Sequence, residues 1–313
     1  MDSTLPSASR LSESVIAVPP LARTTDGKLD RNENVKIVQH IRSGGVSHLL
    51  YGGNALFYHV RPSEFASLLS MLVDISDDKT SIVPSIGPAF GVMMDHIDVL
   101  ADFNFPTVMV LPQRDITDPV GIASGIRVAA ERLGRPLIVY LKFNRWLPVD
   151  LIKRLEADGA ISWIKYAVVL DDPLKDDYLR EVLEVFPAER IISGIGEQPA
   201  IIHLRDFGVG GFTSGCVCVQ PQPSQQMLHA IQAGRWDEAE AIRRYFLPLE
   251  NLRNEINPIR VLHEAVSIAG IAKTGPLLPL VSPLDEAART RIAEAVATLA
   301  RGLDFSKAAA VSK

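Results

Sequence analysis

The segment Ile161-Ser-Trp-Ile-Lys-Tyr-Ala-Val-Val-Leu170 is an apolar run that contains one charged residue, Lys165, near its middle. Its aromatic and β-branched residues are typical of a buried β-strand. An ammonium group inside such a strand is costly unless it is paired or loses its proton. Lys165 could therefore extend from a strand end into solvent with its stem packed, or it could be a neutral amine that attacks a carbonyl.

Short apolar runs of this kind alternate with amphipathic, helix-length segments from residue 14 to about residue 233. The predicted strands are Ser14–Pro19, Ser47–Tyr51, Ser81–Ile86, Thr107–Leu111, Leu137–Leu141, Trp163–Val168, Arg190–Ser193 and Gly211–Cys216. The predicted helices between them include Pro62–Ile75, Asp118–Leu133, Pro173–Phe186 and Pro199–Phe207. This alternation predicts an α/β protein with a parallel sheet, and eight strands are the number that closes a (β/α)8 barrel. An open, doubly wound sheet would alternate in the same way, but its usual glycine-rich nucleotide turn is missing from the first connection.

After residue 234 the pattern changes to helices alone, namely Trp236–Leu252, Pro258–Ala269 and Leu284–Ala300. We therefore expect a TIM barrel over residues 13–233 and a three-helix extension packed on it over residues 234–303. Residues 1–12 have no apolar core and indicate a flexible tail instead of a signal peptide. Residues 304–313 indicate a frayed tail.

Composition limits the classes of partner. The 313 residues carry a net charge of −5, which argues against nucleic acid or an anionic membrane as the main partner. No apolar run approaches the roughly 20 residues that a membrane span needs.

The only cysteines are Cys216 and Cys218, which predict a cytoplasmic location without disulfides. Their spacing would place both thiols on one face of a strand, but no second ligand pair accompanies them, so we expect no metal.

In a barrel of this type the active site lies where the strands end at their carboxyl side. Alternation along the strand Leu137–Leu141 places Tyr140 on the same face as Lys142, and Tyr140 would lie beside Lys165 on the next strand. A phenol there can transfer the protons that imine formation requires, although it could equally be a core residue bonded to a carbonyl. Lys142, as a second cation, would lower the pKa of Lys165.

Glycines follow two other strands. The backbone N–H groups of Gly52, Gly53 and Asn54 can converge on an anion, although such a sequence is also common in simple turns. Gly194 and Gly196, after the seventh strand, could cradle a phosphate or could form another ordinary turn.

Taken together, these pieces resemble the dihydrodipicolinate synthase/N-acetylneuraminate lyase family of class I aldolases over roughly residues 14–300. The resemblance is carried by Gly45–Asn54, Pro136–Tyr140, Trp163–Lys165, Ile192–Gly194 and Gly210–Ser214. It implies that Lys165 forms an imine with the ketone of a 2-keto acid such as pyruvate, and that Tyr140 is the proton shuttle. It implies no metal or organic cofactor, because the iminium itself accepts the electrons.

The chain also departs from the family. Gly52-Gly53-Asn54 stands where the family usually has a hydroxyl-bearing Gly-Thr-Thr turn. Gln113 and Arg114 stand where synthases carry a tyrosine that reaches the neighbouring subunit's site. Arg145 falls five residues after Tyr140, where synthases place a carboxylate-binding arginine, but the usual Asn-x-Pro is absent. These departures predict a reaction other than that of the synthase.

The sequence thus predicts a Schiff-base lyase that cleaves, condenses or dehydrates a 2-keto acid such as pyruvate or a keto-deoxy sugar acid. The expected catalytic residues are Lys165 and Tyr140, and the expected substrate-binding residues are Gly52, Gly53, Asn54, Lys142, Arg145 and Gly194. We expect a homo-oligomer, either a dimer or a tetramer. The alternative is a family member that has lost catalysis and binds or senses a small acid; a metal-dependent aldolase would lack its ligands.

Overall fold

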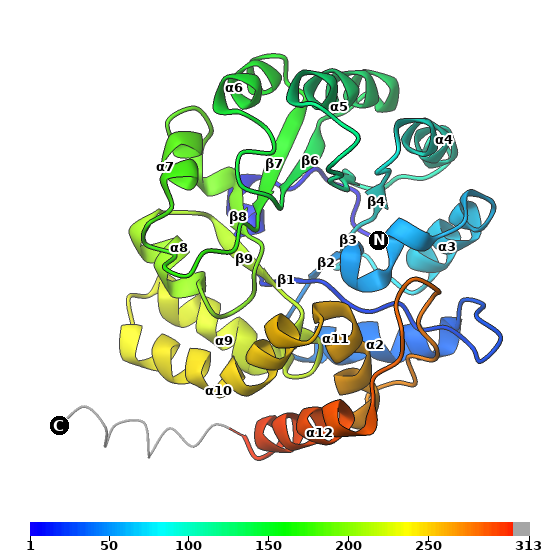
Figure 1. Ribbon diagram of the computed structural model, residues 1–313, viewed down its shortest axis with the longest axis vertical. Coiled ribbons are helices and arrows are strands. Elements are labelled where there is room, and N and C mark those ends of the chain that lie inside the picture. Colours follow the sequence, from blue (N-terminus) through cyan, green and yellow to red (C-terminus); the bar gives the residue numbers. More distant parts are fainter. Residues whose placement is uncertain (303–313) are drawn as a thin grey trace.

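The strands form one parallel sheet that closes into a barrel (Figure 1). The sheet closes because its first and last strands follow one another directly in the chain. The computed structural model describes residues 1–302. The strand order is β3-β2-β1-β9-β8-β7-β6-β5-β4, and only Pro84 separates β3 from β4. The strands are β1 (Ile16–Ala17), β2 (His48–Leu50), β3 (Ser81–Val83), β4 (Ser85–Ile86), β5 (Met109–Val110), β6 (Leu137–Leu141), β7 (Ile161–Tyr166), β8 (Ile191–Ser193) and β9 (Gly211–Ser214).

When β3 and β4 are taken as two halves of one strand, the ring has eight strands and every neighbouring pair is parallel. The predicted (β/α)8 barrel is therefore confirmed. Most strands are shorter than the predicted apolar runs. The reason is that the hydrogen bonds between neighbouring twisted strands end before the apolar sequence does. At the start of β1, for example, the N–H of Val15 donates to the side chain of Gln225 and not to a neighbouring strand.

The predicted course of the chain after β9 is wrong. The run Gly211–Cys216 was expected to continue as a strand that carries Cys216 and Cys218 on one face, but β9 ends at Ser214. Ser214 Oγ accepts a hydrogen bond from the N–H of Val217, which turns the chain into the 3₁₀ helix η4 (Cys216–Cys218). Both cysteines are buried free thiols.

Helices surround the sheet on its outer side (Figure 1). They are α2 (Arg31–Ser43), α3 (Pro62–Asp74), α4 (Phe90–Leu100), α5 (Pro119–Leu133), α6 (Val149–Ala157), α7 (Asp177–Leu183), α8 (Ala200–Asp206) and α9 (Pro221–Gln232). The start of α5 follows the sequence signal, because the side chain of Asp118 accepts hydrogen bonds from Val120 and Gly121 and Pro119 occupies the first turn. Helix α7 begins later than predicted because Asp176, and not Asp172, is its N-cap and accepts from the N–H of Leu179.

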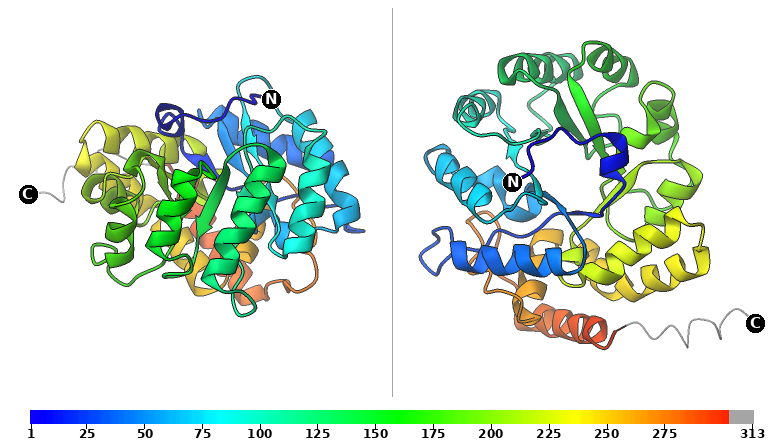
Figure 2. Two further views of the ribbon diagram at one scale, coloured as in Figure 1. Left: turned by 90° about the horizontal axis from the view of Figure 1, so that it is seen from above. Right: turned by 180° about the vertical axis from the view of Figure 1, so that it is seen from behind.

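Three helices follow the barrel, as predicted: α10 (Trp236–Glu255), α11 (Pro258–Ile268) and α12 (Glu286–Ala300). They lie together on one side of the ring, next to α2 and α9, with α12 outermost (Figures 1 and 2). Helix α11 reaches the end of β2, where His263 Nε2 donates to the carbonyl of Asn54 at 2.9 Å. The predicted frayed tail, residues 304–313, lies outside the described residues.

The N-terminal segment runs across one end of the barrel, as the rear view in Figure 2 shows. Within residues 1–12, for which the sequence indicated a tail, the short helix α1 (Ala8–Leu11) forms, and its Leu11 is buried. The carbonyl of Arg10 accepts a hydrogen bond from His48 Nε2 on β2. No helix among residues 1–302 has both the length and the apolar character needed to cross a bilayer.

Candidate active site

Lys165 lies near the carboxyl end of β7, a strand whose six residues are all buried. Only 6% of Lys165 is exposed, so its amine is not in bulk solvent. Strands β6 and β7 pair with Tyr140 directly opposite Lys165. The Lys165 Nζ atom lies 4.0 Å from the centroid of the Tyr140 ring. The two residues that the sequence nominated for catalysis are thus in contact.

The surroundings of Lys165 favour the neutral amine. Burial, followed by the positive charges of Lys142 and Arg253, lowers the pKa of Lys165 to about 7. The pKa of Lys142 is itself lowered by the protein around its amine and by the charge of Arg114, although part of this side chain is in solvent. Near neutral pH, therefore, a large fraction of Lys165 is a free amine and can act as a nucleophile.

Tyr140 has the properties of a proton donor. Burial raises its pKa to about 12, so the phenol keeps its proton at neutral pH. A core tyrosine usually bonds to a carbonyl, as Tyr178 does with the carbonyl of Leu147. Among the described residues the hydroxyl of Tyr140 has no such partner, and the ring lines a cavity. The hydroxyl is therefore available to a ligand.

The cavity has a volume of about 200 Å³ and lies where the strands end at their carboxyl side. The barrel contributes Gly52, Gly53, Asn54, Tyr58, Tyr140, Lys142, Lys165 and Gly194, and the helical extension contributes Arg253, Asn254, Pro258 and Ile259. The extension residues and Tyr58 were not expected from the sequence. Tyr58 lines the cavity together with Tyr140, and its hydroxyl donates to the carbonyl of Pro112 at 3.3 Å.

Gly52, Gly53 and Asn54 form the start of a 3₁₀ helix, η1 (Gly53–Ala55), immediately after β2. Among the described residues the backbone N–H groups of Gly53 and Asn54 have no hydrogen-bond partner, and both residues line the cavity. The Asn54 side chain is already engaged, because its Nδ2 donates to the carbonyl of Val18 at 2.9 Å. The backbone of this turn, and not the asparagine amide, is the available anion-binding group.

Gly194 has a steric role. The sequence had suggested that its N–H could bind a phosphate. That N–H instead donates to the carbonyl of Tyr166 at 2.6 Å and is not available to a phosphate. A Cβ atom at this position would lie 2.8 Å from the Cβ of Ala167 and 3.0 Å from the Cγ of Lys165. The glycine therefore leaves the space that the stem of Lys165 occupies.

The structure does not bring Arg145 to the cavity. Its guanidinium binds both carboxylate oxygens of Glu181 at 2.6 Å and lies over the ring of Tyr178. The loop after β6 turns outward at this point, and Trp146 fixes it by donating from Nε1 to the carbonyl of Gln113 at 2.7 Å. Spacing from Tyr140 alone could not show this turn.

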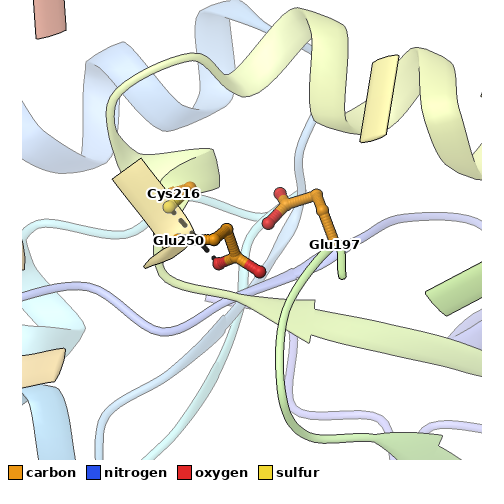
Figure 3. Close-up of side chains that lie close together, drawn as sticks. All are labelled: Glu197, Cys216 and Glu250. Atoms are coloured by element: carbon orange, nitrogen blue, oxygen red, sulfur yellow. Dashed lines mark hydrogen bonds between the residues drawn. The ribbon is translucent and has the colours of Figure 1, made fainter. Parts of the chain in front are cut away.

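A buried polar cluster adjoins the cavity. It consists of Glu197, Cys216 and Glu250, which Figure 3 shows, together with Arg253. One potential ligand atom from each of Glu197, Cys216 and Glu250 lies within 4.8 Å of the others, which is close enough to consider a metal ion. The guanidinium of Arg253, however, already lies 3.1 Å from Glu250 Oε1 and 4.0 Å from Cys216 Sγ. Burial also raises the pKa of the Cys216 thiol, which keeps its proton. The cluster therefore suits a guanidinium better than a metal ion.

Comparison with known proteins gives one family. The model of the dihydrodipicolinate synthetase family matches residues 116–299. A 4-hydroxy-tetrahydrodipicolinate synthase of Streptococcus uberis is 23% identical over 266 residues, which are 82% of this chain and 83% of that protein. A second synthase, from Chlorobium phaeobacteroides, is 29% identical over 181 residues, covering 56% of this chain and 59% of that one.

Solved structures of the family share the fold. Dihydrodipicolinate synthase of Oceanobacillus iheyensis matches with a TM-score of 0.83 at 22% identity, covering 94% of this chain and 98% of that chain. Sialic acid aldolase of Ruminococcus gnavus matches with a TM-score of 0.81 at 12% identity, covering 93% of this chain and 98% of that chain.

The lowered pKa of Lys165 predicts a specific pH dependence. Only the neutral amine reacts, so trace acetylation of Lys165 by acetic anhydride should be slow below pH 7 and rise through a midpoint near pH 7. The readout is peptide mass spectrometry, normalised to a small amine of known pKa. Lys142→Met should shift the midpoint upward because it removes a neighbouring positive charge. A midpoint near the 10.5 of an ordinary lysine would contradict the assignment.

Proposed function

This chain belongs to the dihydrodipicolinate synthetase family of class I aldolases and lyases, and we propose that it acts on a 2-keto acid through an imine at Lys165. The observation that carries the proposal is the contact of a buried amine of lowered pKa with a phenol that has no partner among the described residues. Both groups face one cavity, at the end of the barrel where enzymes of this fold have their active sites.

Imine formation needs a nucleophile and a proton donor. The Lys165 nitrogen adds to the ketone carbon of the substrate. The carbonyl oxygen takes a proton from Tyr140, and the resulting phenolate takes a proton from the nitrogen, which gives a neutral carbinolamine. Tyr140 then protonates the hydroxyl of the carbinolamine, which leaves as water, and a protonated imine remains. Because Tyr140 lies directly across from Lys165, a single phenol can serve these transfers.

The substrate's carboxylate is proposed to bind the N–H groups of Gly53 and Asn54. Backbone donors at the start of a helical turn stabilise an anion without any change in their own protonation. This turn is held in place by two hydrogen bonds of Asn54, one from its side chain to Val18 and one to its carbonyl from His263. The donors are therefore fixed before the substrate arrives.

The imine draws electrons from the bonds next to it. When the substrate has a hydroxyl at C4, breaking the C3–C4 bond gives an aldehyde and an enamine. When the C3–H and a C4–O bond break instead, the products are water and an unsaturated imine. Both outcomes use the iminium as the electron acceptor. After cleavage the enamine takes a proton at C3 to become an imine again, and in both cases hydrolysis of the imine then frees the product and restores the Lys165 amine.

We further propose that the natural substrate is a hydroxylated 2-keto acid longer than pyruvate. Lys142 and Arg253 give the cavity two cationic side chains, and Asn254 also lines it. A homo-oligomeric assembly and a cytoplasmic location remain predictions; two buried free thiols are consistent with a reducing compartment.

Borohydride trapping tests the imine directly. With pyruvate present, reduction should add the mass of the keto acid to the peptide that carries Lys165, because the C=N bond becomes a stable secondary amine. Lys165→Ala should abolish trapping, whereas Lys142→Ala, the matched removal of the other amine in the cavity, should leave the adduct on Lys165. An adduct on Lys142 would contradict the assignment. Binding of pyruvate without an adduct would favour a protein that only binds or senses the acid.

Tyr140→Phe tests the proton donor. The ring remains and only the hydroxyl is lost, so the free energy of unfolding should change by no more than about 1–2 kcal/mol. Turnover should fall by about two to four orders of magnitude, the usual scale for a positioned acid–base group. Tyr178→Phe is the matched control, since that hydroxyl bonds to a carbonyl outside the cavity. A fully active Tyr140→Phe variant would make Tyr140 a packing residue.

A substrate panel tests the proposed chemistry. Steady-state rates for pyruvate plus aspartate semialdehyde should be lower than rates for keto-deoxy sugar acids. The reason is that Gly53-Asn54 and Gln113-Arg114 replace the hydroxyl and the tyrosine on which synthases rely. Efficient condensation with the semialdehyde, together with inactivity on every sugar acid, would refute the proposal.

A further inference from the structure

We propose that Arg253 binds a second carboxylate of the substrate, so that the enzyme selects 2-keto acids with an acid group at the far end of the chain. This inference rests on the imine function proposed above and adds a substrate class to it. It concerns a residue of α10 that no feature of the sequence indicated.

Arg253 is held in a fixed position. Only 7% of it is exposed, and its Nη1 donates to Glu250 Oε1, three residues earlier on the same helix, at 3.1 Å. Its Nε donates to the carbonyl of Pro258 at 3.4 Å. Glu250 is fixed in turn, because its Oε2 accepts from the N–H of Gln198 at 3.2 Å. The guanidinium is therefore oriented before any ligand binds.

The barrel leaves room for this side chain. A Cβ atom at Gly215, directly after β9, would lie 2.6 Å from both Cζ and Nη2 of Arg253. Any other residue there would displace the guanidinium from the end of the barrel. The absence of a side chain at Gly215 thus allows a helix of the extension to place a cation beside the strand ends.

Part of the guanidinium remains available. Among the described residues, Nη1 and Nε have hydrogen-bond partners but Nη2 has none, and Arg253 lines the same cavity as Lys165. A planar guanidinium with free N–H groups matches the geometry of a carboxylate. In the proposed function the substrate's first carboxylate binds the backbone N–H groups of Gly53 and Asn54. Arg253 is therefore available to bind a group further along the substrate.

The net charge of the cluster supports this role. Figure 3 shows Glu197 and Cys216 beside Glu250. Burial and the charge of Glu250 raise the pKa of Glu197, which favours its neutral form. Its Oε1 accepts from Ser224 at 2.7 Å. Arg253 therefore faces one carboxylate and not two, and with Lys142 the cavity retains net positive charge.

The test compares acids of equal length that differ only in the terminal group: 2-oxoglutarate against 2-oxopentanoate, and 2-oxoadipate against 2-oxohexanoate. The readout is the concentration of each acid that gives half-maximal borohydride trapping at Lys165. Taking the ratio within one protein cancels any effect of a variant on the pKa of Lys165. The wild type should prefer the diacid of at least one pair by about 10- to 100-fold, the scale of a charge-assisted hydrogen bond.

Two variants assign the preference to Arg253. The double change Arg253→Met with Glu250→Gln removes the ion pair without leaving a buried charge, and it should reduce the preference to about threefold or less. Arg253→Lys, which keeps the positive charge beside Glu250, should reduce it partially. The matched control is Arg243→Met with Glu240→Gln, an ion pair of the same spacing on the same helix that does not line the cavity. It should retain the full preference.

The outcomes are distinct. If pyruvate is not trapped at Lys165 in the wild type, the proposed function itself fails. If pyruvate is trapped but neither diacid is preferred over its monoacid, Arg253 does not bind a second carboxylate and the inference is overturned while the function stands. A preference that survives in the folded Arg253→Met/Glu250→Gln protein overturns it as well.

Discussion

The burial of the Lys165 amine inside β7 is the constraint on which the rest of the site depends. A lysine in an apolar strand is costly unless its charge is paired or given up, and here burial and two neighbouring cations lower its pKa to about 7. The same burial requires space for its stem, which the absence of a side chain at Gly194 provides. The reactivity of Lys165 and the packing around it therefore have one physical cause.

The helical extension is part of the site. Helix α11 fixes the turn after β2 through the bond from His263 to the carbonyl of Asn54, and α10 places Arg253 over the end of β9. A barrel alone would present the strand ends to solvent on this side. The extension narrows the opening to a cavity of about 200 Å³, where interactions between charges are stronger than they are in water.

The fold and the cavity make different demands on the sequence. The chain matches solved relatives with TM-scores above 0.8 at identities of 12–22%, since many apolar sequences satisfy the alternating pattern of a barrel. The residues that line the cavity are not held to this pattern. The turn at Gly53-Asn54 and the loop that carries Arg145 both lie beyond the ends of their strands, β2 and β6.

The sequence by itself determined the barrel and the pairing of Tyr140 with Lys165. Alternation of strands and helices is a local pattern, and neighbouring parallel strands bring residues at the same height into contact. Three features were decided only by the tertiary structure. The side chain of Arg145 turns outward to Glu181, the N–H of Gly194 donates to the carbonyl of Tyr166, and Arg253 reaches the cavity. Arg253 follows Lys165 by 88 residues. Contacts between residues so far apart in the sequence depend on how whole helices pack, and no local sequence pattern predicts that packing.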